Sequence, residues 1–357
     1  IYLCGATVQA PPHIGHIRSG INFDILRRWL IATGYDVTFI RNVTDIDDKI
    51  LHNAIHEEMP WWALAQKYER VFTAAYAELN VLPPTYEPRA TGHITQMVEL
   101  IARLIDRGKA YPVANGDVYL DVRALDEYLT LSGQKIDDLQ SSPDTDELSL
   151  SLKKNPQDFA LWKSAKPGEP SWPTPWGDGR PGWHIECSAL ALRELGETID
   201  LHGGGSDLIF PHHECERAQS EAATGAPFVK HWMHVAMVFK DGEKMSKSLG
   251  NLVFVDQLRT LWDPRSIRIA IIEHHYRTEW EWDETLMPRS SARLTQWVAS
   301  VGGTQSDLLD SVRTCLDNDL DTPGALALID AAAAKGVDVS ASAALLGVEL
   351  HTSVGPR

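Results

Sequence analysis

The sequence predicts an α/β protein in which a parallel sheet is split by an insertion and followed by a helical domain. Three observations lead to this fold class. A strand, a helix and a second strand are expected within roughly the first 45 residues, which is the pattern of a βαβ unit. Strand-like runs resume near residue 197, after a middle region rich in Pro, Gly and Trp, and the chain beyond Pro264 shows mostly helical periodicity.

The opening residues supply the first strand and helix. Residues 1–8, IYLCGATV, combine apolar and β-favouring side chains, as a short buried strand does. Helical periodicity begins near Gly15, and a second strand is expected over residues 36–45. Such a connection implies parallel strands with a right-handed crossover. Two amphipathic helices are expected next, over Trp61–Glu78 and His93–Arg107.

The middle of the chain differs from both ends. Residues 116–122 are typical of a strand and Ser141–Asp146 of a loop. Residues 167–182 indicate a shaped irregular segment, because tryptophans among the prolines and glycines favour packing over disorder. The sheet pattern then returns, with a strand at 197–205, a helix at 211–224 and a strand at 231–239.

These elements divide the chain into four segments around a Rossmann-type sheet. The two halves of that sheet come from segments far apart in the chain, and the connective insertion lies between them. Residues 1–109 form the first half of the Rossmann-type domain, 110–182 the insertion, 183–263 the second half and 264–357 the α-helical domain.

Composition narrows the classes of function. The 357 residues include 33 basic and 49 acidic side chains, for a net charge of −16. This charge repels phosphate and argues against a protein that coats nucleic acid, so a nucleic-acid partner needs a local basic strip. Arg18, Arg27 and Arg28 are the candidates for such a strip. Four cysteines do not suggest a disulfide scaffold, and no stretch is long and apolar enough for a membrane span, so a cytoplasmic protein is expected.

Two short motifs have the composition of anion sites. His13-Ile14-Gly15-His16 lies where the first strand gives way to the first helix, so that backbone N–H groups and the positive helix end can face an anion. Lys244-Met245-Ser246-Lys247-Ser248 follows a strand and a turn, and its two lysines suit a pyrophosphate leaving group. Taken singly, the two histidines are better explained as ordinary loop residues, and a solvated basic loop explains the lysines equally well.

A metal site is a further hypothesis. Cys4 ends the first strand and Cys187 begins a later element, while His212 and Glu216 are four residues apart and share a helix face. Two thiolates, an imidazole and a carboxylate would make a zinc site. The spacing is not that of a zinc finger, so composition alone favours the alternative of small core cysteines and a helix-capping histidine.

At these residues the chain resembles the class I aminoacyl-tRNA synthetases, and more closely the cysteinyl-tRNA synthetase family. The resemblance rests on YLCGATVQAPPHIGHIRSG, FIRNVTDIDDKI, GEPSWPTPWGDGRPGWHIECS, GGGSDLIFPHHE and GEKMSKSLGN, and it covers most of the chain. It implies zinc ligands at Cys4, Cys187, His212 and Glu216, an ATP site at His13, Gly15, His16, Gly204, Asp207 and Lys244 to Ser248, and a cysteine pocket at Thr44 and Trp183.

The resemblance implies a reaction and its cofactors. Cysteine would be activated with ATP and Mg²⁺ as cysteinyl adenylate and transferred to tRNA(Cys), with one Zn²⁺ per chain on the substrate thiolate. His13, His16, Lys244 and Lys247 would be the catalytic residues. Zinc would then separate cysteine from serine, which an apolar pocket does poorly. A monomer is expected, and the anticodon-binding region of the family is not expected within this sequence.

Two other functions stay open at this point. The mycothiol ligases share the catalytic core and join cysteine to the amine of glucosaminyl-inositol; GNLVFV, HHYRTEWEW and LDTPGALALID resemble that family more. The N-terminal half and Glu216 follow the synthetases instead. A non-catalytic paralogue that binds a nucleotide or RNA is the third possibility, although it would have no need of the full set of motifs.

Overall fold

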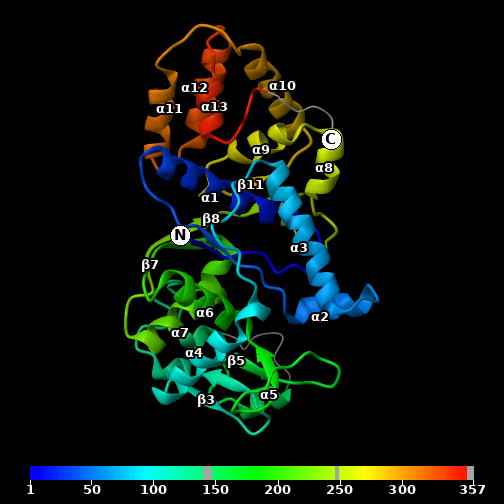
Figure 1. The fold of residues 1–357 in the computed structure, drawn as a ribbon, viewed down its shortest axis with the longest axis vertical. Coiled ribbons are helices and arrows are strands. Elements are labelled where there is room, and N and C mark those ends of the chain that lie inside the picture. The colour runs from blue at the N-terminus through cyan, green and yellow to red at the C-terminus, as the bar shows by residue number, and fades with distance from the viewer. Residues whose placement is uncertain (140–146, 246–248, 352–357) are drawn as a thin grey trace. The chain divides into compact units, whose positions relative to one another are not determined.

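The computed structural model describes residues 1–139, 147–245 and 249–351, so the loop predicted at Ser141–Asp146 lies outside it. The chain forms two compact units, and each is described by itself (Figure 1). Unit 1 comprises residues 1–9, 40–67 and 85–233, and unit 2 comprises residues 10–39, 68–84 and 234–357. None of the described helices is long and apolar enough to cross a membrane.

Unit 1 contains the predicted parallel sheet. Strand β1 (Tyr2–Leu3) pairs in parallel with β2 (Ile40–Arg41) and with β7 (Ile199–Gly205), and β8 (Val229–Val235) lies beyond β7. The first two strands are shorter than predicted. The regular pairing ends near Cys4, where the Gly5 amide donates to the side-chain oxygen Oδ1 of Asn42 at 2.8 Å.

Three helices of unit 1 lie side by side: α4 (Ile94–Asp106), α6 (Trp183–Leu195) and α7 (Glu214–Thr224) (Figure 1). Helix α6 also packs on the sheet, where apolar side chains of both exclude water. The buried cluster between them holds Tyr2, Ile40, Cys187, Leu190, Ala191, Ile199 and Phe228.

The insertion forms a second, antiparallel sheet. Its order is β3 (Ala110–Pro112), β4 (Val118–Leu120), β5 (Phe159–Ser164) and β6 (Gly179–Pro181). The irregular segment before β6 is tied back, since the Trp172 amide donates to Gly179 O at 2.7 Å. Unit 1 also contains two short helices, α2 (Asp48–His56) and α5 (Glu147–Leu152).

Unit 2 is mostly helical. Helix α1 (Ile14–Ala32) packs against α9 (Pro264–Ile272), and α10 (Leu286–Ala299) packs against α9 and α12 (Thr322–Ala333). Most of α3 (Trp61–Glu78) belongs here too, with both predicted ends confirmed. The remaining elements are β9 (Val238–Lys240), β10 (Glu243–Lys244), α8 (Val255–Leu261), β11 (Trp280–Glu281), α11 (Leu308–Asp317) and α13 (Ser340–Leu345).

The strand predicted over 231–239 is interrupted, because β8 ends at Val235 and β9 begins at Val238. The carbonyl oxygens of Ala236 and Met237 turn instead to the guanidinium of Arg18, with 3.0 Å between Nη1 and Met237 O. The same guanidinium also donates to the carbonyl oxygens of His275 and Thr278. The Arg18 side chain therefore supplies the hydrogen-bond donors that a neighbouring strand would supply in an unbroken sheet.

The expected basic strip on α1 is not present in this form. Arg18 is only 1% exposed, and burial lowers its pKa to about 10. Arg27 donates to Pro83 O at 2.6 Å, and Arg28 donates to Asp24 Oδ2 at 2.8 Å. Arg18 is therefore not part of an exposed basic strip, because its donors hold backbone carbonyl oxygens inside unit 2.

Candidate functional site

In unit 1, three predicted site residues lie near the carboxyl ends of adjacent parallel strands. Cys4 follows β1, Thr44 follows β2, and Gly204 is the next-to-last residue of β7. The Cys4 amide donates to Gly203 O at 3.0 Å, which fixes the first and last of these strands together. Parallel α/β sheets bind ligands at this edge. Asp207, by contrast, is exposed in the short turn after β7.

Helices α6 and α7 supply the other predicted residues of unit 1. Trp183 is the first residue of α6 and Cys187 lies one turn further along. The helix predicted from residue 211 begins at Glu214 instead, after a kinked segment over Ile209–His213 in which Phe210 has an extended backbone. His212 and Glu216 nevertheless meet as predicted, with 2.7 Å between Nε2 and Oε1.

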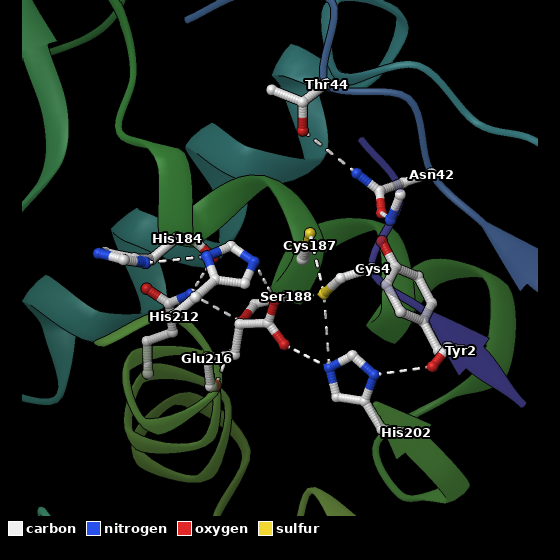
Figure 2. A network of polar contacts seen from close by, with 12 residues as sticks. Tyr2, Cys4, Asn42, Thr44, His184, Cys187, Ser188, His202, His212 and Glu216 are labelled. Atoms are coloured by element: carbon white, nitrogen blue, oxygen red, sulfur yellow. Dashed lines mark hydrogen bonds and ion pairs between the residues drawn. The ribbon is translucent and has the colours of Figure 1, made fainter. Parts of the chain in front are cut away.

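The structure brings the four predicted metal ligands together (Figure 2). One ligand atom from each of Cys4, Cys187, His212 and Glu216 lies within 4.8 Å of the others. The sulfur atoms are 3.8 Å apart, and Cys4 Sγ is 3.3 Å from Glu216 Oε1. A tetrahedron with zinc–sulfur bonds of about 2.3 Å has a sulfur–sulfur edge of about 3.8 Å, so this donor set fits zinc.

His212 favours the charged forms of Glu216 and Cys187, whereas burial and the neighbouring Cys187 and Glu216 raise the pKa of Cys4. Burial alone would favour the protonated acid of Glu216, but the charges of His212 and His202 hold its pKa well below the ordinary value. Burial likewise opposes the charged form of His212, and Glu216 and Cys187 outweigh it, raising the pKa to about 10. For Cys187, burial is outweighed by the hydrogen bond from Cys4 and by His212, which lower the pKa of the thiol to about 7. An easily formed thiolate and an ionised carboxylate are the forms that bind metal.

His202 is a residue of this cluster that the sequence analysis missed. It is fully buried in β7, its Nδ1 lies 2.8 Å from Tyr2 O, and its Nε2 hydrogen-bonds to Glu216 Oε2 (Figure 2). With His213 it also offers a second set of donors, which shares Cys4 and Glu216 with the first. A histidine within a strand of buried residues was the available signal, since such a ring needs polar partners.

Of the two predicted cysteine-pocket residues, Trp183 contacts a predicted metal ligand directly. The Trp183 ring stacks on His212 with 4.1 Å between centroids and 26° between planes. Thr44 is buried, and its Oγ1 accepts from Asn42 Nδ2 at 3.3 Å (Figure 2).

In unit 2, the two histidines of the HIGH motif cap helix α1. His13 Nδ1 accepts from the Gly15 amide at 3.1 Å, and His16 Nδ1 accepts from the His13 amide at 3.4 Å. A Cβ on Gly15 would lie 2.9 Å from the His13 ring, so glycine is needed for this cap. Because both Nδ1 atoms accept, the proton of each neutral ring is on Nε2, so each neutral ring donates from Nε2.

The described part of the KMSKS motif lies in the same unit. Lys244 ends β10, which pairs with β9, and Asn251 Nδ2 donates to the carbonyl oxygen of Lys244 at 3.4 Å. The chain after the motif then joins the HIGH segment, since the Ile14 amide donates to Val253 O at 2.9 Å. Unit 2 thus brings the HIGH motif and the exit of the KMSKS loop together. Lys247, with Ser246 and Ser248, lies outside the described residues.

Comparisons with known proteins agree with one another. Residues 1–292 match the family described as "tRNA synthetases class I (C) catalytic domain". A cysteine–tRNA ligase of Streptomyces coelicolor is 50% identical over 98% of the chain and 60% of its own length. A cysteine–tRNA ligase of Streptomyces avermitilis is 52% identical over 94% of this chain and 73% of its own length. A Mycobacterium tuberculosis methionyl-tRNA synthetase, solved with methionyl-adenylate, has the same fold with a TM-score of 0.68 at 17% identity, over 98% of this chain and 87% of that one. The chain spans about three fifths to three quarters of the curated relatives' length.

Proposed function

The chain belongs to the cysteine–tRNA ligase family of class I tRNA synthetases, and we propose that it activates L-cysteine with ATP and transfers it to tRNA(Cys). One observation carries the choice of amino acid: two thiols, an imidazole and a carboxylate converge at the edge of the parallel sheet. When bound there, zinc would favour a substrate thiolate over a hydroxyl, because it is a soft enough ion to prefer sulfur. Cys4, Cys187, His212 and Glu216 would hold it.

The residues of unit 2 support the use of ATP. In the proposed step, a carboxylate oxygen of cysteine attacks the α-phosphorus of ATP-Mg²⁺, and the bond to pyrophosphate breaks. His13 and His16 would donate from Nε2 to the charge that develops on the phosphates. Lys244 and Lys247 would neutralise the leaving pyrophosphate, and Gly204 and Asp207 would bind the adenosine.

The second proposed step is acyl transfer. The terminal ribose hydroxyl of the tRNA attacks the carbonyl carbon of cysteinyl adenylate, and AMP leaves. We expect a monomer that works in the cytoplasm. Neither the amino-sugar acceptor nor a non-catalytic role is favoured, because the similar curated proteins are named cysteine–tRNA ligases.

The proposal is tested by amino-acid-dependent ATP–pyrophosphate exchange. Cysteine should support exchange, and serine at the same concentration should not. Radiolabelled cysteine is then offered to tRNA and to glucosaminyl-inositol separately. Exchange with cysteine, followed by product on tRNA only, is the expected outcome. Absence of exchange would refute activation, and product on the amino sugar alone would refute the acceptor.

A further inference from the structure

Glu186 is a buried acid beside the metal cluster with no role so far. It lies in α6 three residues after Trp183 and directly before Cys187, so all three share one side of the helix. Its side chain is 1% exposed. The side chain of Thr44 hydrogen-bonds to its carboxylate. Among the residues that the structure describes, none hydrogen-bonds to the other oxygen, Oε2.

An unpartnered carboxylate oxygen at this depth needs an explanation, because buried polar atoms in proteins almost always have partners. The two acids near Glu186 cannot provide a positive charge as its partner. Asp45 and Asp47 add negative charge near Glu186. The two oxygens of Asp45 accept from the amide and hydroxyl of Thr91, at 2.9 and 2.5 Å, and Asp47 accepts from the Lys49 amide at 2.8 Å. A cationic hydrogen-bond donor would satisfy Oε2 and offset this negative charge.

We propose that Glu186 Oε2 accepts a hydrogen bond from the α-ammonium group of the substrate cysteine. The inference rests on the proposed function and deepens it. In cysteine only two carbon atoms separate the sulfur from the nitrogen, so the group that binds the ammonium must lie beside the groups that hold the thiol. Glu186 meets this condition, being next to Cys187 in the chain and joined to Thr44. Glu186 would thus select thiols that carry an α-amine.

The test compares cysteine with 3-mercaptopropionate, which has the thiol and the carboxylate but no amine. Binding of both to the zinc-loaded protein is measured by calorimetry, for the wild type and for Glu186→Gln. The variant should bind cysteine about tenfold more weakly or worse, as expected for loss of a charge-assisted hydrogen bond, and 3-mercaptopropionate nearly as well as the wild type. Equal loss for both ligands, or no loss for cysteine, would overturn the proposal.

Asp45→Asn is the matched control, because it removes a nearby buried charge whose oxygens already have partners. It should leave the preference for cysteine over 3-mercaptopropionate nearly unchanged. If Glu186→Gln does not fold, Glu186→Asp gives the same comparison, and an unchanged preference there also overturns the proposal. A wild type without cysteine-dependent exchange would refute the proposed function. Exchange in the wild type together with full cysteine affinity in Glu186→Gln would refute this inference alone.

Discussion

Replacing Asp24 by Asn should destabilise unit 2 by about 3 kcal/mol, because its carboxylate is the buried counter-charge of Arg268. Asp24 lies in α1 and Arg268 in α9, and both side chains are 1% exposed. Asp24 Oδ2 also accepts from Arg28 Nε at 2.8 Å, and Oδ1 accepts from the Leu82 amide at 2.8 Å. One carboxylate therefore fastens α1 to α9 and to the chain that follows α3.

The magnitude follows from what the variant retains. Removing one partner of a buried pair costs about 3–5 kcal/mol, since the other charge stays buried and uncompensated. The lower end applies here, because Arg268 Nε keeps its bond to Leu346 O at 2.7 Å and the new amide can still accept from Leu82. The guanidinium has little room to move, because a Cβ on Gly347 would lie 2.3 Å from Arg268 Nη2.

The cost should depend on pH. Burial by itself would raise the pKa of Asp24, but the charges of Arg268 and Arg28 outweigh it and hold the pKa below the ordinary value. Since the folded pKa is the lower one, the contribution of the pair is complete above about pH 4 and is lost as the pH falls through the folded pKa. The difference in stability between wild type and Asp24→Asn should therefore be largest at neutral pH.

Urea unfolding followed by tryptophan fluorescence, at pH 7 and at pH 3.5, measures both effects. The control is Asp200→Asn, whose ion pair with Lys230 is exposed, with 82% and 58% of the two side chains accessible. It should change the free energy of unfolding by less than about 0.5 kcal/mol. A cost below about 1 kcal/mol for Asp24→Asn at pH 7, or a cost that does not shrink in acid, would contradict the reasoning.

Three further predictions concern the proposed reaction. Cys187→Ser should lose zinc and cysteine-dependent exchange together, while Cys215→Ser should keep both. Metal analysis and exchange assays of the purified variants measure this. A Cys187→Ser variant that retains zinc and activity would exclude the proposed metal site. Lys247→Ala should slow adenylate formation about 100-fold or more in single-turnover experiments, with cysteine affinity nearly unchanged, and an effect on affinity alone would contradict a role in the transition state. Transfer to tRNA should weaken steeply as salt rises, because phosphate contacts release counterions, while pyrophosphate exchange changes little; a flat salt profile for transfer would count against a tRNA acceptor.

Features that depend on local sequence could be predicted well. Helix α3 begins and ends at Trp61 and Glu78 as expected, because an amphipathic period is a property of neighbouring residues. The parallel sheet was predictable from the βαβ pattern, whose connection has one preferred hand. The metal residues needed more than spacing. Cys4 and Glu216 are 212 positions apart, so residue types and spacing offered them only as a hypothesis, which the resemblance to a family then supported.

Tertiary structure decided which polar side chains are paired, and with what. In sequence His202 is one histidine in a strand; the register of β7 against β1 sets it opposite Tyr2 and brings its ring to Glu216. From the sequence, the guanidinium of Arg18 on helix α1 was expected to face solvent. Arg18 is buried because carbonyl oxygens from residues 236–237 and from 275 and 278 converge on its guanidinium. A charge can be buried only where enough partners meet it, and those partners come from segments that the fold alone brings together.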